Sequence, residues 1–305
     1  MEQLLGSLPG AISQGLIWGI MAIGLYITYK ILAISDLTVD GTIILGEAVC
    51  AVLITSGVNP WVAMLCATAA GALAGLVTGL LHTVLDIPAI LSGILTQMML
   101  WSIYLKVTDG QANVSLNPRK YQLVLTTGDS LNVILTLLAI LAVIIGILYW
   151  FFGTELGCSI RATGCNNNMA RAQGINTEFN KVLGLVISNA IVALSGSLLA
   201  QYQSAADINA GKGAIVIGLA AIVIGDVVMQ KVARNFAVRL CGVLVGGVIY
   251  YMIYQIIVFI GIDTDLLKML SAVVVVIFLG VPNLRAKYFS GIHAKTKKKA
   301  GENNA

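Results

Sequence analysis

Charged side chains are scarce in this chain. Only 10% of its 305 residues are Asp, Glu, Lys or Arg, whereas 58% are hydrophobic and the mean hydropathy is +0.92. A water-soluble protein could not cover its surface with so few polar groups, but apolar residues can face lipid. The composition therefore excludes a soluble globular domain and predicts an all-α, multi-pass membrane protein of a prokaryotic inner membrane.

Residues that support catalysis or metal binding are also few. Histidine occurs only as His82 and His293, and no Glu-x-x-His or His-Glu-x-x-His pattern is present. Gly211-Lys212-Gly213 lacks the upstream Gly and the following Ser or Thr of a phosphate-binding loop. The five cysteines do not have the spacing of a zinc site. We therefore expect no catalytic residues, no metal, no cofactor, no ATPase site of its own and no nucleic-acid partner.

Long apolar runs divide the chain into transmembrane segments. A helix needs roughly 20 residues to cross about 30 Å of hydrocarbon. Nine runs approach that length, near residues 10–30, 38–57, 60–82, 88–106, 131–152, 182–203, 213–230, 240–260 and 266–282. The second and seventh contain Gly and acidic residues, which is typical of broken or re-entrant helices.

The basic residues predict the orientation of this topology. With the N-terminus outside, thirteen of the 18 Lys and Arg residues fall in inside segments and five in outside segments, as the positive-inside rule requires. Nine spans then place the C-terminus inside, whereas eight would put either the 153–181 loop or the Lys-rich tail outside. We expect one transmembrane domain over residues 1–284 and a cytoplasmic Lys-rich tail over 285–305.

The loop at residues 153–181 is unusually polar and long for a simple connection. Its run NNNMARAQG has Asn as an N-cap, good helix formers and a terminal Gly, which predicts a helix of about two turns. Such a helix is not stable alone. Either it is a capped turn on the bilayer surface, or it docks on a partner. In the second case Ala170 and Ala172 allow a shallow groove of the partner to approach closely, and Arg161 and Arg171 pair with acidic residues on the rim of that groove.

Acidic residues lie at membrane depth in two of the predicted spans. A carboxylate at the bilayer centre costs roughly 2.5–3.5 kcal/mol, so each needs a partner or a cavity. We expect Asp36 and Asp40 to cap a broken helix, and Asp226 to pair with a basic residue of the following loop at 231–234. Glu47 has two open interpretations: a cavity-lining acceptor for a substrate ammonium group, or a hydrogen bond to a neighbouring helix.

Two further patterns concern the packing of the spans. Gln97 and Trp101 are four residues apart and share a helix face, so they can line a pathway. Gly71, Gly75 and Gly79 repeat every four residues, which predicts a close helix contact.

Three segments resemble a known family. The run GCSIRATGCNNNMARAQGIN is similar to the cytoplasmic coupling loop of permease subunits of ABC importers. The similarity is specific to the branched-chain amino acid, ribose and basic-membrane-protein permease superfamily. It rests on Arg161-Ala162, Asn166, Ala170 and Gly174-Ile175-Asn176, although the leading Glu of the broader importer motif is missing. SDLTVDGTIILGEAV at 35–49 resembles a subgroup paired with lipoprotein binding proteins for aromatic amino acids, and GLAAIVIGD at 218–226 resembles a late family segment.

This resemblance implies a permease subunit that works by alternating access. Cytosolic ABC ATPase subunits would bind ATP, an extracytoplasmic substrate-binding lipoprotein would deliver the solute to the 107–128 and 204–212 loops, and a second permease copy or paralogue would complete the pathway among membrane lipids. The solute indicated is an amino acid, and an aromatic one in particular.

The candidate site residues form two groups. ATPase coupling is assigned to Arg161, Asn166, Ala170, Arg171 and Gly174, and the translocation pathway to Asp40, Glu47, Gln97 and Trp101. Two alternatives remain: an ion-coupled secondary transporter that uses the intramembrane carboxylates, and a membrane scaffold without transport.

Overall fold

The computed structural model describes residues 2–126, 130–229 and 235–259, together with the isolated positions Met269, Val273 and Val276. The predicted ninth span and the Lys-rich tail at 285–305 lie outside this part of the chain, apart from those three positions. Over the described ranges the regular structure is helical except for one pair of three-residue strands. This agrees with the predicted all-α class.

The helices follow the predicted spans in order. They are α1 (Glu2–Tyr26), the π-helix η1 (Ile27–Ile31), α2 (Val39–Thr55), α3 (Pro60–Thr83), α4 (Ala89–Val107), α5 (Ser130–Gly153), α6 (Glu155–Cys165), α7 (Asn167–Ala172), α8 (Thr177–Gln203), α9 (Ala214–Met229) and α10 (Phe236–Phe259). Within the described residues, six are long and apolar enough to cross a membrane: α1 continued by η1, α3, α4, α5, α8 and α10. With 17 and 16 residues, α2 and α9 are shorter. The count of nine spans and the orientation therefore remain predictions.

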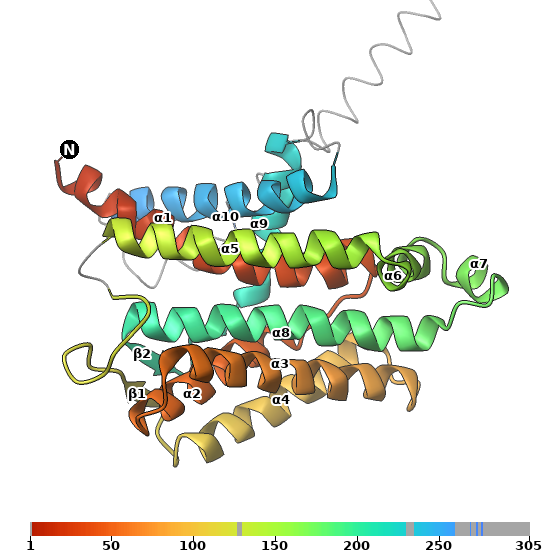
Figure 1. Cartoon of the computed structure of the whole chain (residues 1–305), viewed down its shortest axis with the longest axis horizontal. Helices are drawn as coiled ribbons and strands as arrows, with labels where there is room; N and C mark the ends of the chain where they lie inside the picture. Colours follow the sequence, from red (N-terminus) through yellow and green to blue (C-terminus); the bar gives the residue numbers. More distant parts are fainter. Residues whose placement is uncertain are drawn as a thin grey trace, which may run out of the picture.

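Two helices, α1 and α8, form the centre of the bundle. Of their most apolar stretches, 83% and 67% of the residues are buried, compared with 28% in α4 and in α5. On one side α8 packs against α2 and α3, and α4 covers these two; on the other side α1 packs against α5, α9 and α10 (Figure 1). The outer faces carry large exposed apolar side chains such as Leu73, Met98 and Leu135. Such faces suit contact with lipid.

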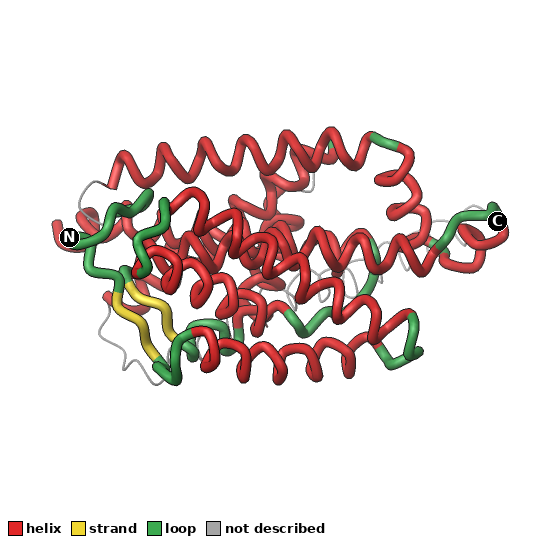
Figure 2. The backbone as a smooth tube through the Cα atoms, turned by 60° about the horizontal axis from the view of Figure 1, so that its bottom comes forward, coloured by secondary structure: helices red, strands yellow, loops and turns green. Residues whose placement is uncertain are grey.

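The connections between helices gather at two opposite ends. At one end α6 and α7 lie beyond α5 and α8 (Figure 1). At the other end, strands β1 (Asn113–Ser115) and β2 (Ala205–Asp207) form an antiparallel pair in which Val114 faces Ala206 (Figure 2). This pairing joins the 107–128 and 204–212 loops, which the topology prediction places on the same side. We refer to the α6–α7 end and the β1–β2 end.

The helices α2 and α9 both begin inside the bundle. At the start of α2 the Thr38 hydroxyl lies 2.8 Å from that of Thr78 in α3, and Thr42 donates a 2.7 Å hydrogen bond to Asn189 in the middle of α8. Gly213, immediately before α9, donates to Asp40 in the first turn of α2. The N-termini of α2 and α9 therefore meet in the interior, which is the interrupted geometry that their sequences predict.

The small residues of α3 pack against α8 as predicted. A Cβ atom at Gly71 would overlap the Asn189 carbonyl oxygen, and one at Gly75 would overlap that of Leu185. Gly79 likewise faces Val182. These glycines let the backbones of α3 and α8 approach closely. Such close packing holds helices together in a membrane, where the hydrophobic effect does not drive them to associate.

We expect Gly75→Val to destabilise the bundle by about 1–3 kcal/mol, because the added carbons have no space at the α3–α8 contact. The matched control is Gly146→Val in α5, where no heavy atom of the described residues, apart from the neighbouring backbone of α5 itself, lies within 4 Å of the added Cβ position. Thermal unfolding of the detergent-solubilised variants measures the difference. Equal melting temperatures for the two variants would contradict the close α3–α8 packing.

Candidate functional site

The helix α6 is held against the bundle along one face. Gly157, Ile160 and Thr163 are buried, and the Asn180 side chain in α8 donates a 3.0 Å hydrogen bond to the Thr163 hydroxyl. Gly164 lies so close to the Ile31 carbonyl that a side chain there would overlap it. The sequence analysis did not predict α6 as a separate helix. Its Gly, Cys, Ser and Thr residues are weak helix formers, so these tertiary contacts stabilise it.

Arg161 connects α6 to two membrane helices. Its guanidinium carbon lies 4.5 Å from the centre of the Phe236 ring in α10 and 5.4 Å from that of Phe152 in α5. Such cation–π contacts stabilise by about 0.5–2 kcal/mol. Arg161 therefore packs against two rings of its own subunit, and its assignment to ATPase coupling stays a prediction.

The short helix α7 forms where the sequence predicts it. The Asn166 side chain accepts a 3.0 Å hydrogen bond from the Met169 N–H, and Gly174 has φ +79°, a left-handed conformation suited to glycine. α7 projects from the end of the bundle (Figure 1). Ala170 is only 2% exposed, so it packs inside the chain, which corrects the prediction that it faces a partner. Met169, 62% exposed, is the large apolar residue on the free face.

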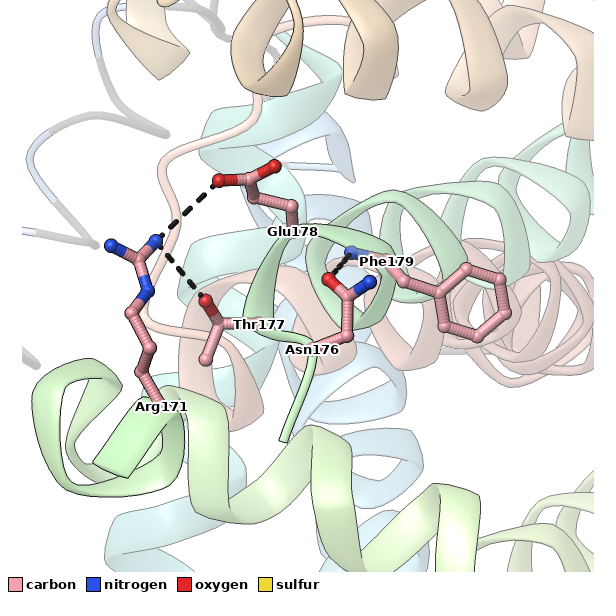
Figure 3. Close-up of polar contacts among 5 residues, drawn as sticks. All are labelled: Arg171, Asn176, Thr177, Glu178 and Phe179. Atoms are coloured by element: carbon pink, nitrogen blue, oxygen red, sulfur yellow. Dashed lines mark hydrogen bonds and ion pairs between the residues drawn. The ribbon is translucent and has the colours of Figure 1, made fainter. Parts of the chain in front are cut away.

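Arg171 ties α7 loosely to the start of α8. Its Nη2 lies 3.5 Å from Glu178 Oε1 and 3.4 Å from the Thr177 hydroxyl oxygen, while Asn176 accepts a hydrogen bond from the Phe179 N–H and caps α8 (Figure 3). The Arg171 and Glu178 side chains are 63% and 62% exposed, so water screens their attraction. A partner can therefore replace this ion pair at little cost.

Asp40 caps a helix other than its own. Its Oδ1 accepts a 2.9 Å hydrogen bond from the Ile215 N–H and its Oδ2 a 3.2 Å hydrogen bond from the Gly213 N–H. Because Asp40 also lies in the first turn of α2, one carboxylate lies at the positive ends of two helices. These hydrogen bonds agree with the predicted capping role, and the assignment of Asp40 to the pathway stays a prediction.

Asp36 lies at the centre of a buried polar network. It accepts hydrogen bonds from the Thr38 N–H at 2.9 Å and from the Asn189 side-chain amide at 2.8 Å, and Asn189 in turn accepts the Thr42 hydroxyl. All four side chains are at most 1% exposed. The network joins the start of α2 to the middle of α8, as expected for Asp36 at a broken helix.

Glu47 lies about two turns further along α2 and is fully buried. Its Oε2 accepts a 3.2 Å hydrogen bond from the Asp207 N–H in β2, and its Oε1 has no hydrogen-bond partner within the described ranges. Next to it, the Tyr104 hydroxyl donates to the Ala206 carbonyl at 3.1 Å. Glu47 thus bonds to strand β2 rather than to a neighbouring helix, and its assignment to the pathway stays a prediction.

We expect Glu47→Gln to retain solute uptake, because the amide oxygen can still accept the Asp207 N–H. Glu47→Leu, of similar size, is expected to lower uptake and stability by leaving that buried N–H without a partner, at a cost of about 1–3 kcal/mol. Uptake assays on both variants test this. Loss of uptake in Glu47→Gln with normal stability would instead support binding of a substrate ammonium group.

Gln97 and Trp101 lie beside the junction of α2 and α9. Gln97 is half-buried and its Cα faces Gly41 in α2. Trp101 is 43% exposed, and the ammonium group of Lys212 lies 5.1 Å from the centre of its ring. Lys212 follows Gly211, which packs against the Asp40 backbone. The structure thus brings three of the four predicted pathway residues, Asp40, Gln97 and Trp101, to one region. It also adds Lys212, which the sequence analysis missed because Trp101 is far from it in the chain.

Asp226 pairs with a residue that the sequence did not indicate. Its carboxylate lies 2.9 Å from the Lys30 ammonium group in η1, and the two side chains are 40% and 46% exposed. The predicted partners at 231–234 lie outside the described residues. The ion pair joins α9 to η1 at the α6–α7 end.

Comparisons with known proteins agree with the motifs. Residues 8–279 match the family model described as the branched-chain amino acid transport system / permease component. The chain is 39% identical over 272 residues to the tyrosine transport system permease protein of Clostridioides difficile, which covers 89% of this chain and 90% of that protein. It is 34% identical to an uncharacterized protein of Rickettsia prowazekii over 88% of this chain and 95% of the relative.

A more distant relative is the ribose import permease protein of Escherichia coli, 25% identical over 92% of this chain and 86% of that protein. No solved structure matches the chain. The family match covers nearly all of the described helices and includes both the α6–α7 segment and the α2–α9 junction. The chain therefore belongs to the family of permease components of branched-chain amino acid transport systems, the membrane subunits of ABC importers.

Proposed function

We propose that this chain forms the solute pathway of an importer driven by separate ATPase subunits, and that these subunits dock on α6 and α7. The observation that carries the proposal is the way in which α6 and α7 are attached to the rest of the chain. α6 is fixed to three membrane helices through Arg161 and Gly164, whereas α7 projects with Met169 exposed and is held by a weak ion pair at Arg171. A displacement of α7 by an ATPase subunit would be transmitted to the bundle through α6.

In this proposal the five coupling residues have different tasks. Asn166 and Gly174 define the two ends of α7, and Ala170 packs the helix against its own chain. Arg171 exchanges Glu178 for an acidic partner residue, and Arg161 transmits the displacement to α5 and α10 through its aromatic contacts. This would switch the bundle between two states biased by nucleotide.

We assign the pathway surface to the region of Gln97, Trp101 and Lys212. An indole ring beside an ammonium group complements the ring and the carboxylate of an aromatic amino acid. Asp40 and Glu47 then position this surface by holding α9 and β2 in place. A second permease copy or a paralogue would cover the exposed face of α4, and the β1–β2 end would receive the binding lipoprotein. Tyrosine is the first solute to test, since one relative is a tyrosine permease protein.

Uptake of labelled tyrosine in cells with and without the chain tests the proposal. We expect uptake that requires the chain, stops on ATP depletion and survives collapse of the proton gradient at constant ATP. Competition by excess phenylalanine, tryptophan, leucine or ribose then defines the solute class. Uptake that is independent of ATP and stops with an uncoupler would establish the ion-coupled alternative instead.

A further inference from the structure

The helix α9 is attached by polar groups near both of its ends. At its start, the Gly213 and Ile215 N–H groups donate hydrogen bonds of 3.2 and 2.9 Å to the Asp40 carboxylate. Near its other end, the Asp226 carboxylate lies 2.9 Å from the Lys30 ammonium group in η1. The two attachments are about 18 Å apart along the helix, at a rise of about 1.5 Å per residue. α9 therefore connects the α2–α9 junction to the α6–α7 end.

Between these attachments, α9 packs against α10 mainly through small residues. Five of the seven buried residues of α9 are Gly or Ala. A Cβ atom at Gly225 would overlap the Gly242 carbonyl oxygen in α10, and one at Gly246 in α10 would overlap that of Ala221. A contact between backbones, with few side chains interlocked, suits the small sliding of packed helices that occurs in shear motions. The polar attachments then limit how far α9 can slide along α10.

Lys30 belongs to the segment on which α6 rests. The Ile31 carbonyl, next to Lys30 in the chain, lies so close to Gly164 of α6 that a side chain at Gly164 would overlap it. This segment is the π-helix η1, a form that is rare and frequently found at functional sites. A displacement of α6 would therefore reach Lys30 through a direct backbone contact.

The start of α9 adjoins the proposed pathway surface. Lys212, whose ammonium group lies 5.1 Å from the centre of the Trp101 ring, precedes the first residue of α9 by two positions. The preceding residue, Gly211, packs against the Asp40 backbone. Since Trp101 belongs to α4, a shift of α9 along its axis would move Lys212 relative to the indole ring.

We propose that the ion pair of Lys30 with Asp226 couples α6 to the pathway surface through α9. The two side chains act as positioning residues, because neither touches the solute. The inference rests on the proposed docking of ATPase subunits on α6 and α7. With 46% and 40% of these side chains exposed, their ion pair contributes little to the stability of the fold, and it can open and close as the subunit changes state.

The test is hydrogen–deuterium exchange, followed by mass spectrometry, of the full-length chain in complex with its ATPase subunits, with and without ATP trapped by vanadate. In wild type, trapping is expected to change the exchange of residues 166–176 and of residues 211–217. The second set includes N–H groups that Asp40 holds, so its exchange reports local opening at the start of α9. Asp226→Asn keeps the shape of the side chain but removes its charge. It is expected to keep the first change and to lose the second.

Two further variants separate pairing from a general effect of charge. Lys30→Asp combined with Asp226→Lys restores an ion pair with reversed charges and is expected to recover the change at 211–217. The matched control is Lys181→Gln. Lys181 is a cation of α8 near the same end of the bundle, and it makes no ion pair within the described residues. This variant is expected to show both changes, and thermal unfolding checks that each variant is folded.

Three results would overturn the inference while leaving the docking site in place. The first is a wild-type change at 166–176 with none at 211–217. The second is an Asp226→Asn protein that shows both changes, since α9 would then move by another route. The third is a folded charge-reversed protein that does not recover the change at 211–217. If trapping leaves 166–176 unchanged in wild type, the docking proposal itself is wrong, and the coupling inferred from it fails as well.

Discussion

A chain carrying Gly174→Pro is expected to lose most of its ATP-driven uptake while its helical bundle melts at the wild-type temperature. Gly174 ends α7 with φ +79°, and its N–H donates a 3.0 Å hydrogen bond to the Arg171 carbonyl. Proline fixes φ near about −65° and has no N–H, so this end of the helix cannot form. Because α7 projects from the bundle, the damage stays local.

Gly174→Ala is the graded comparison for this prediction. A left-handed conformation costs an L-residue roughly 1–2 kcal/mol, so Ala strains the turn without removing the hydrogen bond. Uptake should therefore fall less than with Pro. Uptake rates and thermal unfolding should be measured on both variants in the same preparation. If Gly174→Pro transports solute at the wild-type rate, the shape of α7 is irrelevant to coupling and the proposed docking site is wrong.

Replacing Asp40 by Ala is expected to destabilise the protein and to reduce uptake in parallel. The substitution removes both acceptors for the N–H groups of Gly213 and Ile215 at the start of α9. In the bundle interior each buried donor without a partner costs about 1–3 kcal/mol. Asp40→Asn retains one acceptor oxygen, so its melting temperature and its uptake rate should lie between those of Asp40→Ala and wild type.

The same series separates a capping role from a direct role in the pathway. If Asp40 positions α9, the melting temperature and the uptake rate fall together from Asp to Asn to Ala. If Asp40 instead contacts the solute, Asp40→Ala keeps wild-type stability and loses uptake. Thermal unfolding in detergent and uptake in cells, measured on the three proteins, distinguish these outcomes.

Local signals in the sequence predicted the positions of most helices. Long apolar runs gave α1, α3, α4, α5, α8 and α10 with ends close to those observed, because hydropathy depends on each segment alone. The caps of α7 at Asn166 and Gly174 were predicted for the same reason. Gly and acidic residues also identified α2 and α9 as the interrupted pair.

Contacts between distant segments could not be predicted in this way. Lys30 meets Asp226, and Glu47 meets the Asp207 backbone, across most of the length of the chain. The β1–β2 pair has strands of three residues, too short to show an alternating pattern. α6 contains weak helix formers and depends on packing against η1 and α8.

The orientations of two site residues could not be predicted for a related reason. Composition marks Ala170 as small and Arg161 as charged, but it does not say which way a side chain points. In the structure Ala170 is buried and Arg161 stacks on two rings of its own subunit. The orientation of a short surface helix is set by the neighbours on which it rests, and these come from other parts of the chain.

The central claim, that ATPase subunits dock on α6 and α7, is tested most directly by co-purification from the host. The tagged chain is solubilised in detergent as wild type and as the Gly174→Pro, Arg171→Glu double variant, and both are checked for an intact fold by thermal unfolding. We predict that a cytosolic ATPase is recovered with wild type and lost with the folded double variant. Equal recovery of the ATPase with both proteins, or its absence from both, would contradict the account.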